Sequence, residues 1–462
     1  MPIPPCGPVL GDAGRIDNEW VKIAVLGGGG FRVPMVYAGL LGRADRIRVD
    51  ELALWDVSGG RVRRVAAVCE GLARERSIRV PVREAGSLEE AVDGARFVLC
   101  AVRPGGLEAR ARDERAAQES GLLGQETVGA AGILFALRSI PLVRSLAAAV
   151  AARAPDAFFV NLTNPAGVVT QAAQDVLGER ALGVCDSPSA LLERVAGALG
   201  RPRGRLRFDY AGLNHFGWLL RVQDDGGADL LPDLLADPAR LRMIEEGRLF
   251  DPEWLQDLGM LPNEYLYYYE RTRSAIANLR EAGATRGEAL LTQQIGFFEG
   301  PVEEPEAALA AWRRVRAERE RTYFAEGGLG EAPPDPLSDE GGYAEVALDA
   351  VAALAGGRPA VLVLTAANQR ALPFLPDRAV VEVPCLVDGA GVRPLTQPRL
   401  PLHARARIEL LEEVDRLVLE VARTGDRRKL RHAFALHPLC GGLDTAAELI
   451  DLAIRSWEGV RV

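Results

Sequence analysis

The sequence has little that would support several common classes of function. It holds only four histidines in 462 residues, and its six cysteines stand far apart without a CxxC pair, which excludes a zinc knuckle or a dithiol redox motif. Widely scattered cysteines in a long chain are typical of free thiols in a reducing compartment. The net charge of −9 argues against a nucleic-acid-binding surface as the main function. We therefore expect a cytoplasmic protein that does not bind nucleic acid.

Targeting and membrane signals are also missing. The first twenty residues contain prolines and acids but no basic start followed by an apolar run, so they are not typical of a secretory signal. No stretch reaches about 18 apolar residues without a charge or a break, and we expect no membrane span. We interpret residues 1–20 as a loosely attached tail.

Short apolar runs alternate with helix-like segments over the first 205 residues. Strands that alternate with helices predict right-handed βαβ units and a doubly wound parallel sheet. After about residue 205 the pattern changes to longer strands with partial alternation and to helical stretches around 263–282 and 303–325. We expect a loop rich in glycine, proline and acids over residues 326–342, and the last sixty residues are expected to be helical. We predict an α/β fold, with a Rossmann domain over residues 21–205 and an α+β domain over residues 206–462. The expected strands of the first domain lie at 21–27, 51–57, 95–102, 157–165 and 181–188.

A run of four glycines, Gly27 to Gly30, follows the first expected strand and precedes a helix. Glycine lets the backbone turn tightly and approach a pyrophosphate, and the helix N-terminus supplies amide donors. Asp56 ends the second expected strand, where a carboxylate can bind the ribose hydroxyls of NAD. Glycine turns also join strands to helices in folds that bind no cofactor, and Arg32 stands where a strict GxGxxG needs glycine. Strand, turn, helix and acid together predict NAD binding.

Polar residues gather where the expected strands end, which is where ligands bind in this fold class. Cys185 and His215 follow such strands, and a thiolate and an imidazole could hold a divalent metal with positions left open for substrate. Their spacing alone favours a buried cysteine and a core histidine, whereas the polar neighbours Asp186 and Asn214 favour a functional role. Four tyrosines stand close together between 265 and 269; a helix face packed on the core would account for two or three of them.

Ten motifs in chain order resemble glycoside hydrolase family 4, the NAD- and metal-dependent 6-phosphoglycosidases. The resemblance runs from Val21 to about Asp451 and is strongest to the 6-phospho-β-glucosidase branch. It implies a lactate- or malate-dehydrogenase-like Rossmann domain. The motifs are GGGGFRVP, VRPGGLEARARDE, GQETVG, NLTNPAG, GVCDSP, GLNHFGW, NEYLYYY, ATRGE, VVEVPC and ALHPL.

The resemblance implies roles for individual residues. Cys185 and His215 correspond to the two metal-binding side chains, usually for Mn²⁺, and Tyr265 corresponds to the catalytic base. Asp186 stands in the place of a proposed acid. The remaining residues implied are Arg103, Asn164 and Arg286 for the substrate, and Gly27, Gly28, Gly29, Gly30, Phe31, Arg32 and Asp56 for NAD.

The implied reaction is hydrolysis of a 6-phospho-β-glucoside, from a phosphorylated disaccharide or an aryl glucoside, to glucose 6-phosphate and an aglycone. In this route NAD oxidises C3, the aglycone is eliminated, water adds and NADH reduces C3 again. Family 4 enzymes are thus an exception to the paired-carboxylate mechanism of other glycosidases. Relatives are commonly homodimers or homotetramers.

The sequence leaves alternatives open. Many β-specific members have Asn where this chain has Asp186, so a 6-phospho-α-glucosidase or another family 4 glycosidase fits as well. Near Asn368 relatives often have an Asn-Asn-Gly turn that is absent here. An NAD-dependent dehydrogenase of a hydroxy acid or sugar would share the fold and the glycine turn but would not need Cys185. A non-catalytic NAD-binding regulator would leave the polar loops without a role.

Overall fold

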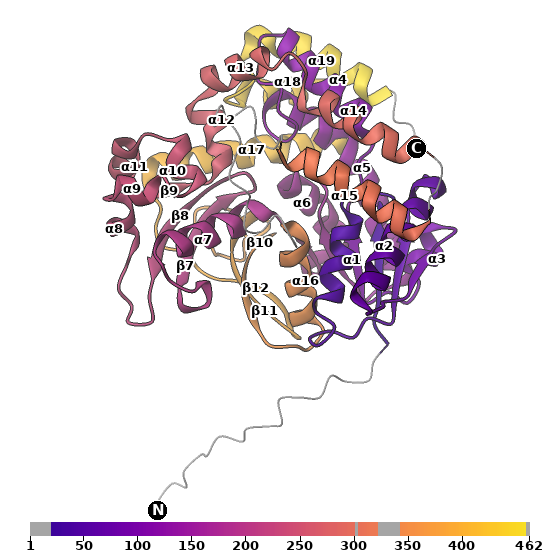
Figure 1. Ribbon diagram of the computed structural model, residues 1–462. Coiled ribbons are helices and arrows are strands. Elements are labelled where there is room, and N and C mark those ends of the chain that lie inside the picture. The colour runs from indigo at the N-terminus through magenta and orange to yellow at the C-terminus, as the bar shows by residue number, and fades with distance from the viewer. Residues whose placement is uncertain (1–19, 301–303, 322–341, 459–462) are drawn as a thin grey trace, which may run out of the picture.

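A computed structural model describes residues 20–300, 304–321 and 342–458. A single mixed sheet of twelve strands runs through the molecule, with helices packed against it (Figure 1). The order of strands is β3-β2-β1-β4-β5-β6-β10-β11-β7-β8-β9, and β12 pairs with β11 outside this path. The strands are β1 Lys22–Leu26, β2 Glu51–Trp55, β3 Val82–Glu84, β4 Phe97–Cys100, β5 Phe158–Asn161, β6 Ala181–Gly183, β7 Arg207–Leu213, β8 Phe216–Gln223, β9 Leu261–Pro262, β10 Ala360–Ala367, β11 Val380–Asp388 and β12 Gly391–Pro394.

The first six strands are all parallel and lie in the order 3-2-1-4-5-6, which is the order of a Rossmann domain. Strand β1 is fully buried, and its residues alternate between two cores. Ile23 and Val25 pack into one core, and Ala24 and Leu26 into the other. Burial on both faces explains why this strand is a continuous apolar run. The expected α/β fold with a doubly wound parallel sheet is confirmed.

The strands after residue 205 do not form a separate sheet. Strand β10 pairs antiparallel with β6, and β11, β7, β8 and β9 continue the sheet in antiparallel pairs. In Figure 1 helices α8 to α11 lie near the β7-β8 end, and α1 to α3 lie at the other end. The division of the chain between residues 205 and 206 stays a prediction. The expected tail, residues 1–20, lies outside the described residues apart from Trp20.

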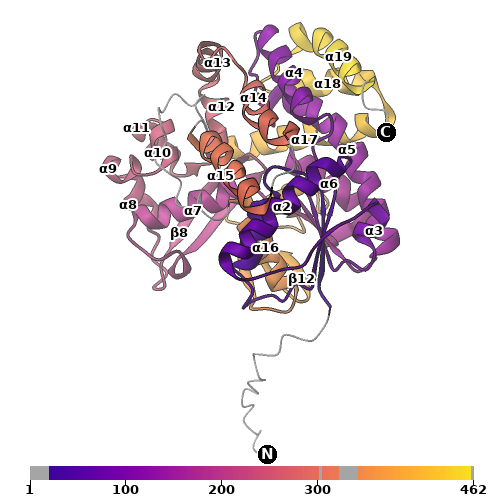
Figure 2. The same ribbon diagram turned by 45° about the vertical axis from the view of Figure 1, so that its right-hand side comes forward.

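The helices of the second half pack over the Rossmann half. Helix α15 lies on α2, α14 lies on α4, and α17 packs against α5 (Figure 2). The expected C-terminal helices are confirmed. The helices are α1 Val33–Leu41, α2 Gly59–Arg76, α3 Leu88–Val92, α4 Gly106–Glu119, α5 Gly129–Arg153, α6 Ala166–Leu177, α7 Asp186–Ala198, α8 Leu231–Leu235, α9 Pro238–Leu241, α10 Glu245–Leu249, α11 Pro252–Leu258, α12 Tyr267–Glu270, α13 Thr272–Glu281, α14 Arg286–Glu299, α15 Pro305–Arg321, α16 Tyr343–Leu354, α17 Leu402–Thr424, α18 Arg427–Leu436 and α19 Leu443–Glu458.

Helix α5 is long and apolar enough, by length and composition, to cross a membrane. Its most apolar window is 67% buried inside the protein, and it packs against α4, α6 and α17. Its Arg138 forms a buried ion pair with Asp113 of α4. These contacts are typical of a core helix in a large domain. The length and composition of α5 are therefore weak evidence that it crosses a membrane.

Candidate active site

The parallel strands bring four loops to one edge of the sheet. Gly27 follows β1, Arg103 follows β4, Asn164 follows β5 and Cys185 follows β6. The carboxyl ends of parallel strands lie at the same edge, where ligands bind in doubly wound folds. The structure therefore places these four sequence-predicted residues along one edge.

The glycine turn is packed too closely for side chains. Gly27 has φ +87°, and a Cβ there would lie 2.4 Å from the carbonyl oxygen of Ala101. A Cβ on Gly28 would lie 2.8 Å from the amide nitrogen of Trp55. Asp56 accepts a hydrogen bond from the Gly29 amide at 3.2 Å. The predicted acid thus lies against the turn, where a ribose next to a turn-bound pyrophosphate would meet it.

Two helices from the second half hold the glycine turn from outside. The Phe31 ring makes an edge-to-face contact with Phe297 of α14, with centroids 5.7 Å apart. The indole N–H of Trp312, on α15, donates to the carbonyl oxygen of Phe31 at 2.8 Å. Both Phe31 and Trp312 are buried. Helix α14 begins at Arg286, so the helix that packs on the cofactor turn also carries a predicted substrate residue.

Cys185 is the N-cap of α7 and Asp186 is its first residue. Burial, and the carboxylates of Glu382 and Asp186, raise the pKa of the Cys185 thiol well above its ordinary value. Its thiol lies 3.9 Å from Asp186 Oδ1. A buried thiol among carboxylates loses its proton only when a cation balances the charge.

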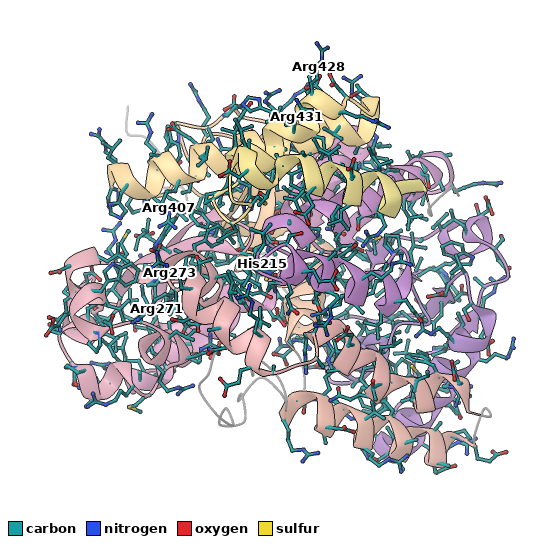
Figure 3. All side chains as sticks on the ribbon, turned by 90° about the horizontal axis from the view of Figure 1, so that it is seen from above. His215, Arg271, Arg273, Arg407, Arg428 and Arg431 are labelled. Carbon is teal, nitrogen blue, oxygen red and sulfur yellow. The ribbon has the colours of Figure 1, made fainter. Side chains whose placement is uncertain are left out.

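His215 is in the two-residue turn between β7 and β8 and has φ +60°, a conformation uncommon for residues other than glycine. Its ring stacks on Tyr265 with centroids 3.7 Å apart and planes 1° from parallel. Burial lowers the pKa of His215 to about 3, so the imidazole is neutral. Its buried Nδ1 has no hydrogen-bond partner. In Figure 3 His215 lies in the interior of the view, while Arg428 and Arg431 lie at the periphery.

A hydrogen-bond network lies behind the His215 turn. Asn214 donates to Glu382 Oε1 at 3.0 Å and accepts the amide N–H of Ala166 at 3.1 Å. Tyr210 and Thr365 also contact the Glu382 carboxyl. Burial raises the pKa of Glu382 to about 7. The network connects the turn that carries His215 with the start of α6, two residues after Asn164.

Cys185 and His215 have the chemistry expected of ligands for a divalent metal. The neutral imidazole offers an unpartnered buried nitrogen, and the thiol lies in an electronegative setting that a cation would relieve. Thiolate and imidazole are ligands that suit transition metals. Among the described residues no group of three or more His, Cys, Asp or Glu side chains is placed to hold a metal. Two protein ligands would leave further positions open for substrate oxygens.

The two predicted substrate arginines are connected through carboxylates. Arg103 pairs with Glu126, and Arg110 pairs with Glu126 at 2.9 Å and with Glu114 at 2.7 Å. Glu114 Oε2 in turn accepts the amide N–H of Gly287 at 2.6 Å, next to Arg286. Burial lowers the pKa of Arg103 to about 9. The chain of contacts brings the Arg103 loop and the start of α14 together.

Sequence reasoning did not single out Glu382, Glu114 or Tyr210. Glu382 had a usable signal, because it is a lone acid in the apolar strand 379–387, and acids are rarely buried without a partner. Of the tyrosine group, Tyr267 and Tyr268 are buried in the core, as a packed helix face requires. Tyr265 lies before that helix, in a 3-10 turn over Glu264–Leu266.

Models of one protein family match most of the chain. Residues 22–201 match the Family 4 glycosyl hydrolase, and residues 210–440 match the Family 4 glycosyl hydrolase C-terminal domain. A "Probable 6-phospho-beta-glucosidase" of Bacillus subtilis (strain 168) is 28% identical over 446 residues, with 94% of this chain and 96% of the relative covered. The 6-phospho-alpha-glucosidase 1 of Lacticaseibacillus paracasei is 27% identical over 451 residues, with 94% and 97% covered.

Solved structures share the fold. The 6-phospho-beta glucosidase of Thermotoga maritima, with NAD and glucose-6-phosphate, superposes with a TM-score of 0.81 at 24% identity, covering 96% of this chain and 99% of that one. A minor L-lactate dehydrogenase of Enterococcus mundtii reaches a TM-score of 0.51 at 16% identity, covering 88% and 99%. The second likeness agrees with the expected dehydrogenase-like Rossmann half. From the two family models, the chain belongs to family 4 of the glycosyl hydrolases.

Proposed function

We propose that this protein hydrolyses 6-phospho-β-glucosides to glucose 6-phosphate and an aglycone, using NAD and a divalent metal, Mn²⁺ in the first instance. One observation carries the proposal: His215, with an unpartnered buried nitrogen, stacks directly on Tyr265. The relatives support the substrate class, because their names include 6-phosphoglucosidases. Related structures contain NAD with glucose-6-phosphate or NAD with Mn²⁺.

The bound groups would supply two kinds of chemistry: NAD would exchange hydride with C3 of the sugar, and the metal would polarise the neighbouring oxygens as a Lewis acid. Cys185 and His215 would hold the metal. The glycine turn and Asp56 would hold NAD.

The chain's own side chains would handle the protons. Tyr265, fixed by its stacking on His215, would remove the proton from C2, which a ketone at C3 makes acidic. Asp186 would donate a proton to the leaving oxygen at C1. Asn164 would contact the hydroxyls near the metal, and Arg103 and Arg286 would bind the 6-phosphate. Arginine suits this task because its guanidinium can bind phosphate through two parallel hydrogen bonds.

Asp186 favours a second candidate, a 6-phospho-α-glucosidase. The described part of the chain places this carboxylate beside Cys185, and several relatives carry α-glucosidase names. Cleavage next to an acidified C2–H depends less on the configuration at C1 than direct displacement does, so both anomers fit this chemistry.

An assay on purified protein tests the proposal. The substrates are 4-nitrophenyl β-glucoside 6-phosphate, its α-anomer and the unphosphorylated β-glucoside, each with and without NAD⁺, Mn²⁺ and a thiol reductant. We expect release from the phosphorylated β-glucoside only when both NAD⁺ and Mn²⁺ are present, without net formation of NADH. Release from the α-anomer alone would favour the second candidate. Release from none, with steady NADH formation from a sugar or hydroxy acid, would favour a dehydrogenase. The cytoplasmic location and the homodimer or homotetramer stay predictions.

A further inference from the structure

The side chain of Asn214 bridges two parts of the candidate active site. It precedes His215 in the β7-β8 turn, and its amide oxygen accepts the N–H of Ala166 while its amide nitrogen donates to Glu382. A backbone N–H can only donate and a carboxylate oxygen can accept, so these partners fix which end of the amide faces which neighbour.

The bond to Ala166 satisfies a group that the helix itself cannot. Ala166 is the first residue of α6, and its cap residue, Pro165, provides no side-chain hydrogen bond. The first amides of a helix have no partner within the helix. Asn214 therefore caps α6 from the β7-β8 turn. The two elements also approach closely, since a Cβ added to Gly167 would lie 3.4 Å from the Asn214 Cβ.

The two bonds fix the separation between the turn that carries His215 and the loop that carries Asn164. On one side His215 follows Asn214 directly. On the other side Asn164 lies two residues before Ala166. The Glu382 carboxyl anchors the amide from β11 and is itself held by Tyr210 and Thr365. A leucine at position 214 would have a similar size but could make neither bond.

We propose that Asn214 is a positioning residue that sets the separation between the imidazole of His215 and the side chain of Asn164, so that both reach the same sugar. The inference rests on the proposed function, which assigns His215 to the metal and Asn164 to the substrate. The proposed function assigns Asn214 itself to neither. Residues that orient metal ligands from outside typically change metal affinity 10- to 100-fold when they are replaced.

Mn²⁺ binding to the full-length protein, measured without substrate, tests this role. The signal of free Mn²⁺ in electron paramagnetic resonance gives the Kd for wild type, Asn214→Leu and Cys185→Ser. We expect Asn214→Leu to weaken Mn²⁺ binding roughly tenfold or more and to raise KM for the phosphorylated glucoside. Its Kd for NAD⁺ should stay within about twofold of wild type, because the side-chain hydrogen bonds of Asn214 go to Ala166 and Glu382 and not to the glycine turn.

Asn368→Leu is the matched control. Asn368 is also a buried asparagine with several hydrogen bonds, donating to Leu372 and Leu375 and accepting from Leu372. Its side chain bonds within its own loop, to Leu372, Leu375 and Pro376, and none of these bonds reaches a residue assigned to the site. This variant should lose thermal stability but keep the wild-type Kd for Mn²⁺. If Asn214→Leu does not fold, Asn214→Ala replaces it, because the space left can hold a bridging water.

Three outcomes would overturn the inference. The first is that Asn214→Leu keeps the wild-type Mn²⁺ affinity and KM while Cys185→Ser loses Mn²⁺ binding. This result would reject the role of Asn214 and support the proposed metal site. An equal loss of Mn²⁺ affinity in Asn368→Leu would show a general effect of destabilisation. Unchanged Mn²⁺ binding in Cys185→Ser would reject the proposed metal site itself, and the role of Asn214 with it.

Discussion

The rings of His215 and Tyr265 lie face to face, 3.7 Å apart and within 1° of parallel, although fifty positions separate them in the chain. His215 comes from the β7-β8 turn and Tyr265 from the turn after β9. Strand β9 pairs with β8, so the sheet itself brings the two rings together. Stacking against a metal-binding ring would hold the hydroxyl of the base near the metal.

Replacing Tyr265 with phenylalanine removes the hydroxyl and keeps the ring, so the role of the hydroxyl is tested by itself. The Tyr265→Phe protein should fold, keep the ring stacked on His215 and bind NAD⁺ and Mn²⁺ like wild type. Without a general base we expect kcat to fall roughly a hundred- to ten-thousand-fold. The measurement is steady-state release of 4-nitrophenol, together with the rate of wild type on substrate deuterated at C2.

Tyr269→Phe is the control for this prediction. Tyr269 lies one helical turn further on and packs edge-to-face on Phe216 with centroids 4.7 Å apart. It should retain most of the activity. Turnover of Tyr265→Phe at the wild-type rate would reject the assignment of the base.

The glycine turn provides a second prediction. In Trp312→Phe the carbonyl of Phe31 loses its indole donor, and a buried acceptor left without a partner costs about 1–3 kcal/mol. We expect the free energy of unfolding to fall by that amount and the Kd for NAD⁺ to rise, because the turn loses its outer support. Urea unfolding and a fluorescence titration with NAD⁺ measure the two effects. An unchanged Kd for NAD⁺ would mean that α15 only stabilises the fold.

Much of the parallel half of the fold could be predicted from the sequence, because each buried strand is a short apolar run with a polar loop after it. The strands β3, β9 and β12 were not predicted, since their sequences VRE, LP and GVRP are short and contain no apolar run. Helix α14 was also missed, although Thr285 and Glu288 form a capping box that is visible in the sequence. The expected loop over residues 326–342 lies outside the described residues except for Gly342.

The candidate site was predictable only in part. Residues at strand ends could be grouped, since parallel strands end at one edge. The stacking of Tyr265 on His215 depends on the antiparallel pairing of β8 with β9, which no local pattern encodes. The contact of Glu382 with Asn214 likewise depends on a strand more than 160 positions away. The roles of the individual residues stay predictions.

The phosphate side of the site gives a third prediction. Arg286→Gln removes one guanidinium while Thr285 and Glu288 still cap α14. A hydrogen bond between charged groups contributes about 1.5–3 kcal/mol, so kcat/KM for the 6-phosphorylated glucoside should fall roughly 10- to 150-fold. Turnover of the unphosphorylated glucoside, measured in parallel, should not change. An equal loss on both substrates would mean that Arg286 supports the fold of the site and does not bind the phosphate.

A fourth prediction concerns Asp415, on α17. It lines a cavity of about 60 Å³ together with Tyr269 and His437. Burial, and to a smaller extent Glu412, raise its pKa from 3.8 to about 7. Between these two values the folded protein binds more protons at this position than the unfolded chain does. The stability that Asp415 contributes is therefore complete below its ordinary pKa and is lost as the pH rises through 7.

Asp415→Asn removes this titration while keeping the size of the side chain. The variant should gain stability over wild type as the pH rises, by about 1–3 kcal/mol at pH 8 and by less at pH 5. The lower part of that range applies if water in the cavity hydrates the carboxylate. Urea unfolding of both proteins at pH 5 and pH 8 measures the difference. A gain that is the same at both pH values would mean that the Asp415 carboxyl has the same pKa in the folded and unfolded states.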